Sequence, residues 1–158
     1  MTEIAQRPNR FPWPPVIYVA AIAVAAVLAY VVPLPWLPPP TSDILFAVGC
    51  LLVVGALAMD IAAMRTLSRH KTTVMPNKAS AHLVTDGPFG FTRNPIYLGN
   101  TMLTIGIGLI NGSLWFLPAA LVAAFATQKL AIEREERHLD ARFGKRYRDY
   151  CKRVRRWI

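Results

Sequence analysis

The sequence from Ile96 to Thr127 reads IYLGNTMLTIGIGLI-NGS-LWFLPAALVAAFAT and contains no charged residue. Two apolar stretches, residues 96–110 and 114–127, are separated only by Asn111, Gly112 and Ser113. Two helices joined by so short a polar turn must run antiparallel. The segment therefore predicts a helical hairpin that crosses a membrane twice.

Two further apolar stretches precede the hairpin. Residues 15–32 (PVIYVAAIAVAAVLAYVV) carry no charge, and residues 44–59 are uncharged until Asp60. A helix over residues 15–32 rises about 1.5 Å per residue and reaches roughly 27 Å, close to the thickness of a bilayer's hydrocarbon core. The 54% hydrophobic content of the 158 residues is too high for a soluble domain of this size. We expect one all-α integral membrane domain over residues 1–158, with four transmembrane helices at 15–32, 44–64, 95–110 and 113–130, a cytoplasmic loop at 65–94 and a cytoplasmic C-terminal helix and tail at 131–158.

The first apolar stretch has an alternative interpretation as a cleaved signal peptide, because Arg7 and Arg10 precede it. It is longer than the usual signal core, and it ends in a proline-rich segment, residues 33–40, where a cleavage site would have small residues. A retained transmembrane helix is therefore favoured.

The basic residues are distributed on one side only. All 18 lysines and arginines precede the first apolar stretch, lie between the second and third, or follow from Lys129 onward. Because positive charge stays on the cytoplasmic side, both termini and the loop 65–94 are expected in the cytoplasm, in a bacterial inner membrane. The net charge of +9 is then explained by anionic lipid headgroups, with no nucleic acid partner.

The cysteines and histidines predict neither a disulfide nor a metal site. Cys50 lies inside the second apolar stretch and Cys151 lies in the cytoplasmic tail, so the two are not expected to pair. His82 and His138 have no second ligand at a useful spacing. Gly106 and Gly108 are more typical of close helix packing than of a ligand site.

The candidate chemistry begins just before the third apolar stretch. Pro95 suits the first turn of a helix, Asn94 is a candidate N-cap, and Arg93 stands beside that helix N-terminus. Helix N-termini and arginines both attract anions, so this end is a candidate site for a carboxylate or phosphate. The alternative is that Arg93 only sets the membrane topology.

The fourth helix is expected to continue past the membrane into an acidic segment that contains Glu133, Glu135 and Glu136. Acidic side chains toward the end of a helix oppose its dipole and need a counter-charge, for which Arg93 is a candidate. The alternative is a solvated helix in which Glu133 and Arg137 pair across one turn.

Two ordered motifs resemble a known family. Arg93-Asn-Pro-Ile-Tyr97-Leu-Gly99, then the uninterrupted hairpin, then Glu135-Glu136-Arg-His-Leu139-Asp-Ala-Arg-Phe143-Gly144-Lys-Arg-Tyr147-Arg-Asp-Tyr150 resemble the isoprenylcysteine carboxyl methyltransferase and phospholipid methyltransferase superfamily. The resemblance covers about residues 82–154, and the first two apolar stretches match only as generic membrane helices.

The resemblance implies an S-adenosylmethionine cofactor, released as S-adenosylhomocysteine, in a cytoplasmic pocket. By position, the implied pocket residues are His82, Leu83, Val84, Gly87, Arg93, Asn94, Pro95, Tyr97, Glu135 and Glu136. Asn94 stands where the family often has His, and Arg155 stands where it often has Pro, so we expect the contacts at these two positions to differ from those of the family.

The implied activity is methyl transfer to a lipophilic small molecule or lipid at the cytoplasmic face, with Arg93, Glu135 and Glu136 as the catalytic candidates. A carboxylate acceptor, as in the isoprenylcysteine enzymes, would be oriented by Arg93, whereas an amine such as phosphatidylethanolamine would give a proton to Glu135 or Glu136. The polar loop 65–94 is a candidate lid.

The rival interpretations are an NADPH-dependent membrane reductase and a non-catalytic module whose basic tail binds lipid. The sequence leaves the oligomeric state open.

Overall fold

The computed structural model describes residues 13–70 and 82–158. Residues 71–81 of the expected lid, as well as Arg7 and Arg10, lie outside this described part. The helices are α2 (Trp13–Val31), α3 (Thr41–Arg69), α4 (Pro95–Ile110), α5 (Phe116–Thr127), α6 (Glu133–Phe143) and α7 (Lys145–Arg153). A 3-10 turn, η1 (Gly87–Gly90), precedes α4, and a π-helical turn, η2 (Gln128–Ile132), joins α5 to α6.

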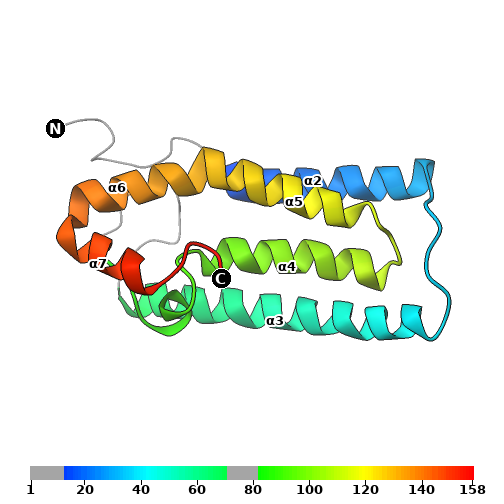
Figure 1. Ribbon diagram of the computed structural model, residues 1–158, viewed down its shortest axis with the longest axis horizontal. Coiled ribbons are helices and arrows are strands. Elements are labelled where there is room, and N and C mark those ends of the chain that lie inside the picture. The colour runs from blue at the N-terminus through cyan, green and yellow to red at the C-terminus, as the bar shows by residue number, and fades with distance from the viewer. Residues whose placement is uncertain (1–12, 71–81) are drawn as a thin grey trace.

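The apolar helices lie side by side in an order that differs from their order in the chain. α3 packs along α4, α4 along α5, and α5 along α2 (Figure 1). α6 continues α5 beyond this layer, and α7 folds back toward the start of α4, where the C-terminus also lies (Figure 1). The chain thereby gathers η1, α6, α7 and its last residues at one end of the bundle.

Small residues fill the space between the helices, and bulky ones face outward. Ala56, Ala63 and Ala120 are completely buried, whereas Leu51 on α3 is 72% exposed and Leu121 on α5 is 69% exposed. In a bilayer, small residues let helix backbones approach closely, while large apolar side chains contact lipid. This distribution is that of helices surrounded by lipid.

Glycines allow α4 to approach both α3 and α5 closely. A Cβ added at Gly106 would lie 2.8 Å from Val53 Cγ2 and 2.9 Å from the carbonyl oxygen of Gly49. A Cβ at Gly108 would collide with Phe116, the first residue of α5. Both glycines therefore serve helix packing, which is the interpretation that the sequence favoured.

The turn between α4 and α5 is as short as the sequence predicts. Gly112 has a φ of +63°, which favours glycine, and the Ser113 amide donates to the carbonyl oxygen of Gly108 at 2.9 Å. The Trp115 indole N–H donates to the Val32 carbonyl oxygen at 2.8 Å, so the end of α2 is tied to the start of α5 at the far end of the bundle.

The prediction of an all-α fold is confirmed. Within residues 13–70 and 82–158, three helical segments are long and apolar enough to cross a membrane: Trp13–Val31, Thr41–Arg69, and Phe116–Phe143 taken through η2. α4 is also apolar but, at 16 residues, it is shorter, with a length of roughly 24 Å. The structure therefore provides three long apolar helices and a shorter fourth.

Candidate functional site

The site is built where the chain enters α4. Thr92 is fully buried, and its hydroxyl oxygen accepts a hydrogen bond from the Asn94 amide at 3.2 Å. Asn94 occupies the N-cap position, but its side chain does not cap the helix as the sequence suggested. Its Nδ2 donates instead to the carbonyl oxygen of Arg156 at 2.9 Å, because the end of the chain passes beside it. Pro95 fills the first turn of α4 and is buried.

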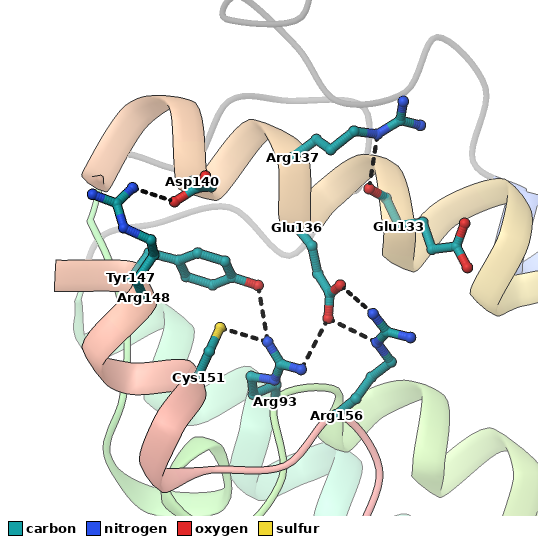
Figure 2. A pocket seen from close by; sticks show the side chains of 9 residues that line it. All are labelled: Arg93, Glu133, Glu136, Arg137, Asp140, Tyr147, Arg148, Cys151 and Arg156. Carbon is teal, nitrogen blue, oxygen red and sulfur yellow. Dashed lines mark hydrogen bonds and ion pairs between the residues drawn. The ribbon is translucent and has the colours of Figure 1, made fainter. Parts of the chain in front are cut away.

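Arg93 and Glu136 meet at this entrance, as the charge pattern predicts. Arg93 Nη2 lies 3.2 Å from Glu136 Oε1, and both side chains are mostly buried, with 15% and 18% of their surface exposed. Glu136 also accepts two hydrogen bonds from Arg156, at 2.9 Å from Nε and 2.6 Å from Nη2 (Figure 2). These hydrogen bonds raise the pKa of the Arg156 guanidinium. One carboxylate therefore bridges two guanidinium groups.

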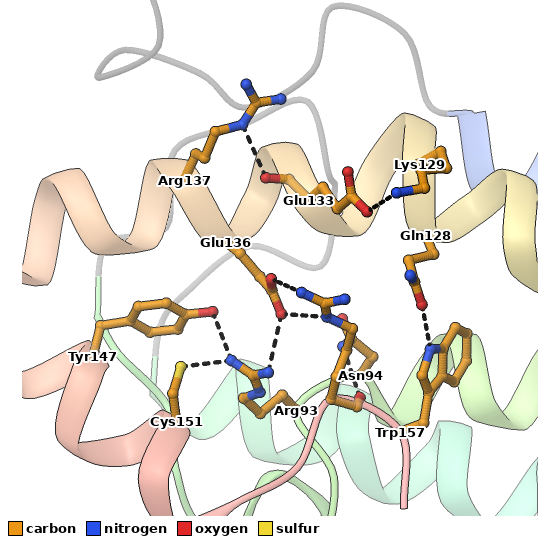
Figure 3. A network of polar contacts seen from close by, with 11 residues as sticks. Arg93, Asn94, Gln128, Lys129, Glu133, Glu136, Arg137, Tyr147, Cys151 and Trp157 are labelled. Carbon is orange, nitrogen blue, oxygen red and sulfur yellow. Dashed lines mark hydrogen bonds and ion pairs between the residues drawn. The ribbon is translucent and has the colours of Figure 1, made fainter.

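α7 closes the other side of Arg93. Gly144, with a φ of +52°, reverses the chain between α6 and α7, a conformation that favours glycine. The reversal lets Arg93 Nη1 donate to the Tyr147 hydroxyl at 3.4 Å and contact Cys151 Sγ (Figure 3). Burial raises the pKa of Tyr147 above its ordinary value. Arg93 Nε is buried and has no hydrogen-bond partner in the part of the chain that the structure describes.

Glu135 faces a different partner from its neighbour. Tyr97, on α4, donates its hydroxyl to Glu135 Oε1 at 2.7 Å. Burial is the largest cause of a rise in the pKa of Glu135 to about 7, and the hydrogen bond from Tyr97 partly opposes it. This carboxyl group is therefore poised to exchange a proton near neutral pH.

A cleft of about 600 Å³ lies between α6, α7 and the entrance to α4, a size typical of small-molecule sites (Figure 2). Its lining residues are Arg93, Glu133, Glu136, Arg137, Asp140, Tyr147, Arg148, Cys151 and Arg156.

Glu133 does not pair with Arg137 through its carboxylate, contrary to the alternative drawn from the sequence. The carboxylate pairs with Lys129 at 2.6 Å, and Arg137 donates to the backbone carbonyl of Glu133.

Of the residues expected to hold a cofactor, only Arg93 and Glu136 line this cleft. His82 is exposed, Val84 is buried, and Leu83 packs against the cluster formed by Tyr147, Tyr150 and Val154. Gly87 lies against Thr66 at the end of α3. Asn94, Pro95, Tyr97 and Glu135 are at the same end of the bundle, beside the cleft but outside its lining. The roles of these residues stay predictions.

Sequence reasoning missed Arg156, Tyr147 and Cys151 as partners of Arg93 and Glu136. Arg156 was one of many charges in a basic tail, and Tyr147 was quoted only as part of a motif. Among residues 13–70 and 82–158, no group of three or more His, Cys, Asp or Glu side chains is placed to hold a metal ion.

Comparison with known proteins gives a family and two curated relatives. Residues 44–146 match the phospholipid methyltransferase family. The nickel-cobalt-cadmium resistance protein NccN of Alcaligenes xylosoxydans xylosoxydans is 34% identical over 106 residues, which are 67% of this chain and 48% of that protein. The protein-S-isoprenylcysteine O-methyltransferase of Tribolium castaneum is 31% identical over 106 residues, 66% of this chain and 38% of that protein. The chain thus spans about half the length of these relatives or less, and no solved structure matches it.

Proposed function

Because the chain belongs to the phospholipid methyltransferase family, we propose that it is a membrane methyltransferase that uses S-adenosylmethionine to methylate a lipophilic acceptor. The observation that carries the proposal is the contact between Arg93 and Glu136 in a polar cleft at the end of an apolar bundle. A soluble cofactor and a lipophilic acceptor can both reach such a place. The preferred acceptor is a carboxylate of the isoprenylcysteine type, and the alternative is a phospholipid amine.

The cleft fits the cofactor in charge and in size. S-adenosylmethionine carries an amino acid end with one carboxylate and one ammonium group, and it supplies a methyl group on a positively charged sulfur. Arg93 lines the cleft and offers guanidinium donors for a carboxylate, because it gives Glu136 a single contact at 3.2 Å. Glu136 offers an acceptor for an ammonium group. The cleft therefore offers a positive group for the carboxylate of the cofactor and, next to it, a negative group for the ammonium.

The chain's own contribution to the reaction is positioning. Methyl transfer is an in-line displacement, in which the acceptor oxygen or nitrogen forms a bond to carbon while the carbon–sulfur bond breaks. Holding the two reactants in line supplies much of the acceleration. An acceptor carboxylate has no proton to lose, so Arg93 needs only to orient it. Its negative charge and the positive sulfur neutralise each other in the transition state, a change that removal of water from around the two reactants favours.

An amine acceptor needs a base in addition to correct positioning. A primary ammonium group must lose a proton before it attacks, and the Glu135–Tyr97 pair, at 2.7 Å, is the base that the chain offers. This pair supports the amine alternative, and the choice between the two acceptors is left to experiment.

The membrane arrangement is part of the proposal. We place α4 across the membrane together with α5, as a hairpin, which gives four transmembrane helices with η1, α6 and α7 on the cytoplasmic side. The exclusion of lysine and arginine from residues 33–43 and 111–113 supports this orientation.

The test supplies methyl-labelled S-adenosylmethionine to the purified protein in lipid nanodiscs, with a prenylated cysteine or phosphatidylethanolamine as the acceptor. We expect label in the prenylated cysteine that mild alkali releases as methanol, as a methyl ester requires. Alkali-stable label in the phospholipid would establish the amine alternative.

Arg93→Ala should lower the rate by about 100-fold, because it removes the donor that orients the acceptor. Arg146→Ala is the matched control, since it removes an equally positive but exposed side chain of α7 outside the cleft. Binding of NADPH without binding of S-adenosylhomocysteine would replace the proposal with a reductase.

A further inference from the structure

The last residues of the chain form part of the site's framework. We call residues 154–158 the C-terminal strap. The Arg93 amide donates to the carbonyl oxygen of Arg155 at 3.0 Å, and the carbonyl oxygen of Arg156 accepts from Thr92 Oγ1 at 3.2 Å. At the other end of the strap, the Trp157 indole donates to Gln128 Oε1 at 2.9 Å (Figure 3). The strap therefore joins the entrance of α4 to the π turn that leads into α6.

Within this framework Glu136 has two unequal partners. Arg156 reaches both carboxylate oxygens, at 2.9 and 2.6 Å, in the bidentate geometry that is the strongest for this pair. Arg93 reaches one oxygen at 3.2 Å. Glu136 is therefore held chiefly by Arg156, and the cluster of two guanidinium groups and one carboxylate has a net charge of +1.

The consequence concerns Arg93. If Arg156 were absent, nothing in the cluster would hold Glu136 away from a bidentate pair with Arg93, and the two charges would cancel. With Arg156 present, the single contact at 3.2 Å leaves part of the donor capacity of Arg93 available in the cleft.

We propose that Arg156 is a positioning residue that holds Glu136 so that the Arg93 guanidinium stays available to a carboxylate in the cleft. The inference rests on the proposed function. The carboxylate belongs either to the cofactor's amino acid end or to the acceptor, and the two sources are separated by which Michaelis constant responds.

The experiment compares Arg156→Ala with Arg155→Ala. Arg155 is the matched control because its side chain is exposed and lies outside the cleft, while its backbone contact to Arg93 is kept. For Arg156→Ala we expect a KM about 10-fold higher for the carboxylate-bearing reactant, with kcat within about 2-fold. Arg155→Ala should change neither. Calorimetry with S-adenosylhomocysteine gives a second measurement: weaker binding in Arg156→Ala assigns the carboxylate to the cofactor, and unchanged binding with a raised acceptor KM assigns it to the acceptor.

A double-mutant cycle tests the route through Glu136. In the Glu136→Gln background no carboxylate remains to close on Arg93, so adding Arg156→Ala should have little further effect. Arg156→Lys keeps the charge with a single point of contact and should lie between wild type and Arg156→Ala. This variant also serves if Arg156→Ala lowers the melting temperature too far for kinetics.

Three results would overturn the inference. Equal kinetics and binding for Arg156→Ala and Arg155→Ala, in an active wild type, would show that Arg156 is not a positioning residue. Fully additive losses with Glu136→Gln would show that Arg156 acts without Glu136. A wild type that neither binds S-adenosylhomocysteine nor transfers methyl groups would remove the proposed function, and this inference with it.

Discussion

Glu135 and Glu136 are adjacent in sequence, but their side chains contact different partners. Successive residues of an α-helix point about 100° apart, so two neighbours cannot share one face. Glu136 turns into the cleft toward Arg93 and Arg156, while Glu135 turns toward Tyr97 on α4. Glu136 is thus the ion-paired residue, and in the proposed reaction with an amine acceptor Glu135 is the residue that would take the proton.

A pH profile separates the two acceptors. Since the pKa of Glu135 is raised to about 7, its carboxylate base form accumulates as the pH rises through that value. With an amine acceptor, the rate should increase between about pH 6 and pH 8, and Glu135→Gln should abolish this increase. With a carboxylate acceptor, the profile should be flat over the same range in both proteins. An increase that persists in Glu135→Gln would assign the base to another group.

The same carboxyl group makes folding stability depend on pH. Its pKa is raised in the folded state above an unfolded value of about 4.3, so the folded protein holds the proton more tightly. The stabilisation is complete below about pH 4.3 and is lost as the pH rises toward 7. Melting temperatures in nanodiscs should therefore fall more steeply with pH in wild type than in Glu135→Gln. Parallel curves would contradict this expectation.

At the residue scale, the sequence predicts one contact and misses the others. Arg93 and Glu136 were paired because an acidic helix extension needs a counter-charge near a helix N-terminus. Arg156 was not recognised, because a basic residue in a tail of basic residues has no distinguishing pattern. Its position depends on hydrogen bonds that the side chains of Thr92 and Asn94, more than 60 residues away in the chain, donate to its backbone carbonyl oxygen.

At the scale of the elements, packing of α3 against α4 depends on the absence of side chains. Gly49 and Gly106 face each other, and backbone atoms, which cannot move aside, occupy the space where a Cβ would go. Gly55 lies on the same helix as Gly49, but an added Cβ there would meet only the flexible end of Met102, at 3.4 Å.

Gly106→Ala should therefore destabilise the protein by about 1–3 kcal/mol, because overpacking forces the two helices apart. Gly55→Ala is the control, and it should leave stability within about 0.5 kcal/mol of wild type, since the Met102 side chain can adjust. Unfolding in detergent, followed by circular dichroism, measures both. Equal stabilities for the two variants would refute the close approach of α3 and α4.

Hydropathy predicted the four apolar helices, because a long uncharged stretch of sequence in a membrane most often forms a helix. Pro95 marked the start of α4 because proline is tolerated in the first turn of a helix. The π turn η2 was not predicted, since nothing in Gln128–Ile132 distinguishes it from a regular helical turn by residue type.

At the scale of the whole molecule, the polar cleft lies at one end of the apolar bundle, beside α6, α7 and the entrance to α4. The spatial order α3, α4, α5, α2 could not be predicted, because the sequences of uniformly apolar helices contain no pattern that specifies which helices pack against each other (Figure 1). The distribution of lysine and arginine, by contrast, predicts which end faces the cytoplasm.

Cysteine labelling tests this orientation. Asn111→Cys and Arg146→Cys place single thiols at exposed positions in the α4–α5 turn and on α7, in a background with Cys50→Ala and Cys151→Ser. In intact bacterial cells, a membrane-impermeant maleimide should label Asn111→Cys, and it should label Arg146→Cys only after permeabilisation. The reverse pattern would invert the proposed topology, and labelling of both thiols in intact cells would place α4 and α5 outside the bilayer.

The π turn between α5 and α6 has a consequence for aligning this chain with its relatives. A π turn holds one residue more than an α turn, so its wider winding can absorb an extra residue while later side chains keep their directions. A one-residue gap set within Gln128–Ile132 is thus harmless. The same gap set between Glu133 and Glu136 would shift the expected direction of every following side chain by about 100°, and it would match a residue other than Glu136 to the position that faces the two arginines. Where an alignment puts its gap here decides which glutamates it treats as equivalent.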